Sequence, residues 1–163
     1  MDKDISQAIQ IWGGQREEAL RVFARQMEQW GLVMPKVEPL VCDFGLGKFS
    51  EVGLIEYWIA NEVEAGYCGK FLFVFDGQRC PEHHHEQKHE TFFVVKGQVG
   101  MTVDGCERVM KEGDSLAMPP GQRHTFVGRG PALLLEASTP CLLEDNFFAD
   151  AAIGKIVHDL PPS

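Results

Sequence analysis

The sequence lacks the features that mark a secreted or membrane-embedded chain. Its first residues, MDKDISQ, contain neither the basic segment nor the apolar segment of a secretion signal. No apolar run approaches the roughly 20 residues that a membrane-spanning helix needs. The cysteines are odd in number, dispersed and without a C-x-x-C pair: Cys42, Cys68, Cys80, Cys106 and Cys141. Such a set favours a reducing compartment over a disulfide framework, so we expect a cytoplasmic protein with no membrane contact.

Positive charge is also scarce. The chain carries 15 lysines and arginines against 24 aspartates and glutamates, a formal net charge of −9. Nucleic acids and anionic membrane surfaces attract proteins with clustered Lys and Arg. The balance therefore argues against either partner. With 163 residues, of which 44% are hydrophobic, the chain fits one structural domain of ordinary size.

Helical periodicity is confined to the N-terminal part. Apolar residues at helical spacing occur first at Ile5, Ala8, Ile9 and Trp12, and Gly13-Gly14 then predict a stop and a restart. A second apolar stripe consists of Leu20, Phe23, Met27 and Trp30. These patterns predict a helical hairpin in residues 1–36. We expect the stripe to pack on the outside of a barrel formed by residues 37–163; the alternative is a dimer contact.

From Val37 onward the pattern changes to short β segments separated by closely spaced turns, with no helix between them. The dipeptide Asp104-Gly105 is a strong hairpin signal between the segments 99–103 and 106–110. Many short strands without intervening helices predict an all-β antiparallel barrel or sandwich. The tail, residues 142–163, is expected to lie over this barrel.

Two stretches contain residues typical of a metal site. The first, Gly77 to Gly97, reads GQRCPEHHHEQKHETFFVVKG, and its His83 and His85 leave the same face of an extended strand. Glu90 follows after a short polar turn. The second stretch, GDSLAMPPGQRH, ends in a turn and His124. If the two stretches are neighbours, three imidazoles and one carboxylate can bind one ion, which suits Mn, Fe, Co, Ni or Zn rather than Ca or Mg.

The histidine run leaves one ambiguity. By alternation, His84 should point away from His83 and His85, and His89 should face away from Glu90. An alternative metal site that uses His84 with Glu86 is also chemically possible, although it breaks the spacing to Gly77 and Gly97.

This spacing resembles the two cupin motifs. The first, G-x5-H-x-H-x4-E-x6-G, falls on Gly77, His83, His85, Glu90 and Gly97. The second, G-x5-P-x-G-x2-H-x3-N, falls on Gly113, Pro119, Gly121 and His124. Gly128 replaces the final Asn, a departure that we expect to affect a turn rather than the metal. The resemblance implies a cupin double-stranded β-helix, or jelly-roll barrel, with a metal held by His83, His85, Glu90 and His124.

The flanking segments narrow the resemblance. The segments CDFGLGKFSEVGL, YCGKFLFVFDGQRCPEHHH and KHETF are similar to the small D-lyxose isomerase branch of the cupins, over residues 42–148. This similarity implies an aldose–ketose isomerase that acts on an open-chain sugar through a cis-enediol. It also implies one divalent transition metal, with Mn favoured over Zn, Fe, Co or Ni, and a homodimer.

An isomerase needs a general base and groups that stabilise a developing oxyanion. Glu136 ends an apolar run and resembles a glutamate of that branch; it points either into the barrel or to water at a strand edge. Lys88 shares the face of Glu90 if the backbone is extended, or is a solvated turn lysine. Lys70 matches a lysine in the resembling sequences, or else points outward. We predict Glu136 as the base, with Lys88 and Lys70 as further catalytic residues.

Weaker candidates and other functions remain open. Glu51 and Glu56 are additional carboxylates, and aromatic residues either wall the pocket or belong to the core: Phe92, Phe126, Trp58 and Tyr57. Four protein ligands leave two open positions on an octahedral ion. The same ligand set therefore also suits a metal-dependent dioxygenase, in which these positions bind O₂ and a chelating substrate. The third alternative is a sugar-binding cupin without catalysis.

Overall fold

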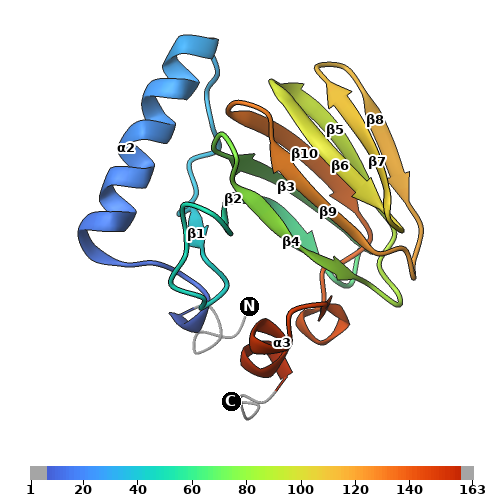
Figure 1. Cartoon of the computed structure of the whole chain (residues 1–163). Helices are drawn as coiled ribbons and strands as arrows, with labels where there is room; N and C mark the ends of the chain where they lie inside the picture. The colour runs from blue at the N-terminus through green and yellow to red at the C-terminus, as the bar shows by residue number, and fades with distance from the viewer. Residues whose placement is uncertain (1–6, 159–163) are drawn as a thin grey trace.

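The computed structural model describes residues 7–158, and β-strands dominate them (Figure 1). The helices are α2 (Gly13–Trp30) and α3 (Ala151–His158), with a 3-10 turn, η1 (Leu143–Asp145). The strands are β1 (Leu40–Cys42), β2 (Leu54–Glu62), β3 (Tyr67–Val74), β4 (Arg79–His84), β5 (Glu90–Lys96), β6 (Gln98–Val103), β7 (Cys106–Lys111), β8 (Ser115–Met118), β9 (His124–Gly128), β10 (Ala132–Ser138) and β11 (Phe147–Phe148).

The strands form two sheets that face each other. One has six strands in the order β1-β2-β3-β10-β5-β8, and the other has five in the order β11-β4-β9-β6-β7. All pairings between these strands are antiparallel. The predicted hairpin is confirmed, since Val103 pairs with Cys106 around Asp104 and Gly105, both of which have positive φ. The all-β jelly-roll prediction is therefore confirmed.

Part of the six-stranded sheet is buried on both faces. Leu54 and Leu72 face the core between the sheets, whereas their neighbours Ile55 and Phe73 face the other way, toward α2. This alternation follows from the period of two along a strand, and it explains why these strands are apolar almost throughout.

Helix α2 covers the outer face of this sheet (Figure 1). The Phe23 ring packs edge-on against Phe73, with centroids 4.9 Å apart, and stacks on Tyr57 at 5.2 Å. Gly31, with φ +65°, ends the helix, and the next N–H, that of Leu32, donates to the carbonyl of Met27 at 3.0 Å. The prediction that the apolar stripe packs on the outside of the barrel is confirmed.

The prediction of helix up to Trp12 is wrong for residues 9–12. Gln10 forms a β-bridge with Cys42, and the N–H of Ile11 donates to the carbonyl of Val41 at 3.0 Å. The open edge of β1 thus supplies partners that compete with helical hydrogen bonds. Gly13 begins α2, which confirms the predicted restart; of the first arm of the predicted hairpin, residues 7–8 are helical, and residues 1–6 lie outside the described residues.

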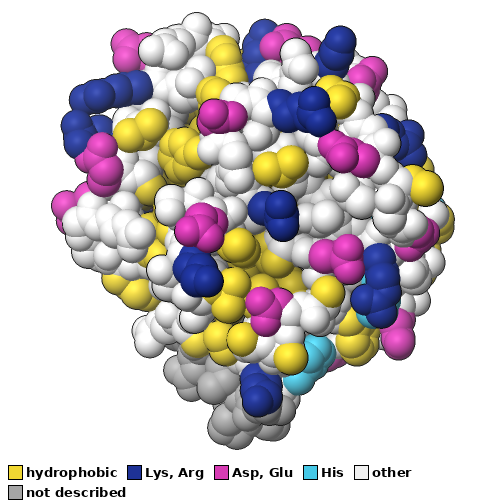
Figure 2. All heavy atoms as spheres, in the orientation of Figure 1, with side chains coloured by type: hydrophobic (Ala, Val, Ile, Leu, Met, Phe, Trp, Pro, Cys, Tyr) yellow, Lys and Arg dark blue, Asp and Glu magenta, His cyan; other side chains and the backbone are white. Residues whose placement is uncertain are grey.

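The C-terminal segment packs on the barrel, where the tail was expected to lie. Ile153 and Val157 of α3 join the core between the sheets, and β11 pairs with β4. Across residues 7–158, no helix combines the length and apolarity needed to cross a membrane. Charges of both signs are interspersed among the described residues on the face in Figure 2, and no basic patch forms there.

Candidate metal centre and active site

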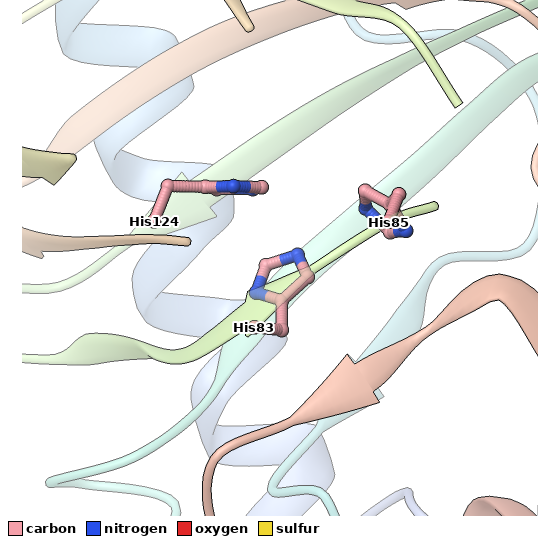
Figure 3. Close-up of side chains that lie close together, drawn as sticks. All are labelled: His83, His85 and His124. Carbon is pink, nitrogen blue, oxygen red and sulfur yellow. The ribbon is translucent and has the colours of Figure 1, made fainter. Parts of the chain in front are cut away.

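Three histidines converge inside the barrel (Figure 3). His83 of β4 lies directly opposite His124 of β9, and His85 immediately follows β4. One nitrogen from each ring lies within 4.8 Å of the others. The spacing of His83 and His85 brings both to the same site, as predicted, and the adjacency of β4 and β9 supplies the third ring.

Hydrogen bonds to the backbone fix the orientation of all three rings. Each Nδ1 lies beside a carbonyl oxygen: His83 beside Pro81 at 2.8 Å, His85 beside Asp145 at 2.7 Å and His124 beside Gln122 at 3.1 Å. Because a carbonyl only accepts, each Nδ1 carries the proton and each Nε2 presents a lone pair. Burial, together with the neighbouring His124 and His85, lowers the pKa of His83 well below its usual value, which keeps that ring neutral.

Glu90 completes a set of electron-pair donors. Its Oε1 lies 3.4 Å from Nε2 of His85, and its Oε2 lies 3.2 Å from Nε2 of His124. These two nitrogens and Oε2 are buried and make no hydrogen bond. Acceptors that face one another without a proton repel unless a cation stands between them. Three imidazoles and a carboxylate suit a divalent transition metal, so the residues present fit such an ion.

Electrostatics also favours an ionised Glu90. Burial would raise the pKa of Glu90, but the ammonium of Lys88, 2.5 Å from Oε1, lowers it. The pKa of Glu90 therefore lies well below its usual value, and the carboxylate is available as an anionic ligand.

The motif glycines have backbone roles. Gly121, with φ +85°, donates its N–H to the carbonyl of His85 at 2.7 Å and so joins the two motifs. At Gly128, a Cβ would lie 2.2 Å from the carbonyl oxygen of Phe75. An asparagine cannot fit this backbone, so the departure from the motif concerns the turn beside Phe75, as expected, and not the histidines.

A chain of alternating charges runs from Glu90 along the six-stranded sheet. The Nζ of Lys88 lies 2.5 Å from Oε1 of Glu90 and 2.5 Å from Oε1 of Glu136. The other oxygen of Glu136 lies 3.3 Å from Nζ of Lys70, which stands directly opposite on β3. Lys70 then lies 3.7 Å from Glu56, whose carboxylate accepts a hydrogen bond from Trp58 Nε1 at 2.7 Å.

The two lysines are buried and charged. Burial and the neighbouring Lys70 would lower the pKa of Lys88, but the carboxylates of Glu136 and Glu90 raise it above its usual value. Burial would likewise lower the pKa of Lys70, but Glu136 and Glu56 outweigh it and raise that pKa well above its usual value. Glu136, which is only 2% exposed, lies between these two ammonium groups.

Two adjoining cavities connect this array with solvent. An inner cavity of about 50 Å³ is bordered by His83, His85, Glu136, Phe92 and Phe126, among others. An outer cavity of about 620 Å³ includes Trp58, Asn61 and residues 141–144 in its wall. Both cavities share Phe44, Glu56, Lys70, Asn146 and Phe148. The arrangement suits a small polar molecule that reaches the histidines with one end and fills the outer cavity with the other.

The structure separates the remaining candidates. Lys88 lies behind Glu136 and lines neither cavity. Tyr57 packs against α2, and the exposed Glu51 also lines neither cavity. His84 stacks on Phe147 with ring centroids 5.2 Å apart, and His89 is exposed, so alternation predicts both orientations correctly.

Two neighbours of the histidines were not predicted. Asp145 accepts hydrogen bonds from the backbone of residues 86–88, and Phe148 stacks on His83 with centroids 5.4 Å apart. Both belong to the tail, more than 50 residues from the histidine run. The only sequence signal was the mixture of acidic and aromatic residues in that tail, which does not indicate a partner.

Comparisons with known proteins identify the family of the chain. The cupin domain family matches residues 71–138, and the D-lyxose isomerase family matches residues 24–104. A D-lyxose ketol-isomerase from Thermofilum is 31% identical over 145 residues, covering 71% of this chain and 79% of the relative. A D-lyxose ketol-isomerase from Cohnella laeviribosi is 32% identical over 152 residues, covering 76% and 81%.

A solved structure is similar over nearly the whole chain. It is the L-ribose isomerase of Acinetobacter sp. DL28 in complex with L-ribose, with a TM-score of 0.73, 17% identity, and coverage of 91% of this chain and 96% of that one. At this identity the likeness supports the fold alone. The sequence relatives carry the assignment, and they confirm the resemblance found in the motifs: the chain belongs to the D-lyxose isomerase family of cupins.

Proposed function

We propose that the protein is a metal-dependent aldose–ketose isomerase that interconverts D-lyxose and D-xylulose through a cis-enediol. One observation carries the proposal: Glu136, held between two buried lysines, lines the same inner cavity as His83 and His85. Membership of the D-lyxose isomerase family supports the choice of sugar.

The residues that would hold the metal are His83, His85, Glu90 and His124. When bound, the ion polarises the sugar carbonyl and stabilises negative charge on adjacent oxygens. Mn²⁺ is the proposed ion, and Zn, Fe, Co and Ni are the alternatives that the same donor set admits.

Glu136 is the proposed base. It removes the proton from C2 of the open-chain aldose and returns it to C1 on the same face, which yields the ketose. The Lys70 ammonium, which lines both cavities, donates a proton to O1 and recovers one from the C2 hydroxyl, so the charges balance. A lysine can do this because it has three N–H donors, not all of which are taken by its carboxylate partners.

Lys88 has a different role in this proposal from the one expected from sequence. Because it lines neither cavity, it acts as a positioning residue, holding Glu136 and Glu90 in place with one ammonium group. Glu56 and Asn146, which border both cavities, are placed to accept and donate hydrogen bonds to the remaining sugar hydroxyls, and Trp58 offers a flat apolar wall.

The test is turnover of D-lyxose by the Mn-loaded protein in the absence of oxygen, with D-xylulose measured by chromatography. Formation of the ketose supports the proposal. Oxygen-dependent consumption of a substrate with Fe²⁺, and none without oxygen, would instead establish a dioxygenase. Tight binding of the sugar without turnover would establish a sugar-binding cupin.

We also propose a cytoplasmic homodimer. All five cysteines are free, which suits a reducing compartment. The β2–β3 hairpin exposes Ile59, Val63 and Tyr67, each at least half accessible, which suits contact with a second copy. Sedimentation equilibrium tests the dimer, and a monomer at micromolar concentration would contradict it.

A further inference from the structure

The carboxylate of Asp145 binds the loop between β4 and β5. Its Oδ1 accepts the N–H groups of Glu86 at 2.8 Å and Gln87 at 3.1 Å, and its Oδ2 accepts that of Lys88 at 2.9 Å. Asp145 is only 2% exposed, and within residues 7–158 no basic side chain forms an ion pair with it. Three successive N–H groups that converge on a buried carboxylate make charge-assisted hydrogen bonds, the stronger class.

The backbone carbonyl of Asp145 also orients one of the metal-binding side chains, His85. Its carbonyl oxygen lies 2.7 Å from Nδ1 of His85, which sets the tautomer and aims Nε2 at the metal centre. Beyond η1, Phe147 pairs with His84 and Phe148 pairs with His83. The segment from Asp145 to Phe148 therefore runs alongside the whole histidine run.

The same segment borders the proposed sugar site. Residues 142–144 line the outer cavity, and Asn146 and Phe148 line both cavities. Asp145 lines neither cavity, and its carboxylate binds the loop that carries Lys88. The side chain of Asp145 thus holds the loop, whereas the adjacent Glu144 and Asn146 border the outer cavity.

We propose that Asp145 is a positioning residue that sets two parts of the site: the imidazole of His85 and, through the backbone of residue 88, the ammonium that bridges Glu90 and Glu136. This inference deepens the proposed function and rests on it for the kinetic effect. The effect on metal binding follows from the geometry alone.

The test compares Asp145→Asn with Asp43→Asn. Asn retains the size of Asp but offers one acceptor oxygen, so at least one loop N–H loses its partner. Asp43 is a matched control because its buried carboxylate also accepts two backbone N–H groups, those of Gly45 at 2.9 Å and Gly47 at 2.8 Å. Mn²⁺ affinity of the metal-stripped full chain is measured by EPR of the free ion, without sugar.

For Asp145→Asn we expect the Mn²⁺ dissociation constant to rise about 10–100-fold, the range typical for partners of metal ligands. At saturating Mn²⁺, kcat for D-lyxose should fall while KM stays near the wild-type value. Asp43→Asn should leave the dissociation constant unchanged. Unchanged Mn²⁺ affinity in Asp145→Asn, or an equal loss in Asp43→Asn, would overturn the inference.

A second measurement uses the wild-type protein and does not depend on the variant folding. The side chains of Glu86 and Gln87 are exposed, yet their amides are bonded to a buried carboxylate. Hydrogen exchange at residues 86–88 should therefore be strongly slowed, and exchange as fast as in an unstructured peptide would refute the inference. Since Mn²⁺ binding and amide exchange need no sugar, their outcome is independent of whether the protein isomerises D-lyxose.

Discussion

The ammonium of Lys88 lies 2.5 Å from a carboxylate oxygen of Glu90 and 2.5 Å from one of Glu136, so a single cation joins the metal centre to the proposed base. All three side chains are at most 2% exposed. A buried cation between two anions is destabilising to remove, because each carboxylate is then left without a counter-charge.

Lys88→Met should therefore lower the free energy of unfolding by about 3–5 kcal/mol, the range for breaking a buried ion pair. The measurement is urea denaturation followed by circular dichroism. In a double-mutant cycle, Lys88→Met with Glu136→Gln should recover part of the loss, since one unpaired charge is gone. Strict additivity of the two changes would show that the 2.5 Å contact carries no energy.

Glu56 should affect sugar binding more than chemistry. Its carboxylate borders both cavities and is oriented by Trp58. Glu56→Gln should raise KM for D-lyxose about tenfold or more, because a hydrogen bond to a charged group contributes about 1.5–3 kcal/mol, and kcat should change little. Steady-state kinetics measure KM and kcat separately.

The control for this variant is Glu107→Gln, on the exposed strand β7, where the carboxylate pairs with Arg129 at 2.9 Å. Both kinetic constants should be unchanged in that variant. A Glu56→Gln enzyme with wild-type KM would show that Glu56 does not contact the sugar.

The contact between α2 and the six-stranded sheet should depend on Phe23, which is 2% exposed and packs on Phe73 and Tyr57. Phe23→Ala should cost about 3–5 kcal/mol of stability, as for other buried phenylalanines. Val22, 38% exposed on the same helix, is the control, and its replacement by Ala should change stability by no more than about 0.5 kcal/mol. Thermal or urea denaturation of both variants measures the two losses of stability. Equal losses would show that the apolar stripe of α2 lies outside the core.

The cysteines should differ sharply in reactivity. Burial raises the pKa of Cys42 and of Cys80 well above the usual thiol value, whereas Cys106 is exposed. Because the thiolate is the reactive species, iodoacetamide should modify Cys106 in the native protein and should reach the other two only after unfolding. Peptide mass spectrometry reads the sites. Native alkylation of Cys42 or Cys80 at the rate of Cys106 would contradict the packing of the core.

Local spacing made part of the site predictable. His83 and His85 are two residues apart, so strand alternation was enough to predict that they share a face, whereas the position of Lys88 depended on the conformation of the loop between β4 and β5. The turn at Asp104-Gly105 and the stripe on α2 were predictable for the same reason, since each depends on residues close in sequence.

Register between distant strands was not predictable. Glu136 faces Lys70 because β10 pairs with β3, and Lys70 reaches Glu56 because β3 pairs with β2. The alignment of these strands depends on packing of both sheet faces, which no single segment encodes. Asp145 was missed because its hydrogen bonds go to backbone N–H groups, which every residue except proline offers and which leave no mark in the sequence.

The most direct test of the central claim is deuterium exchange at C2 of D-lyxose in D₂O, read by NMR with Mn-loaded protein and no oxygen, for the wild type and for Glu136→Gln. We predict that the wild type incorporates deuterium at C2 and forms D-xylulose. Glu136→Gln, with the same Mn content, should lose both about 10²–10⁴-fold, the usual contribution of a general base. Full exchange in Glu136→Gln would contradict the role of this residue, and no exchange by the metal-loaded wild type with any pentose or hexose would contradict the isomerase itself.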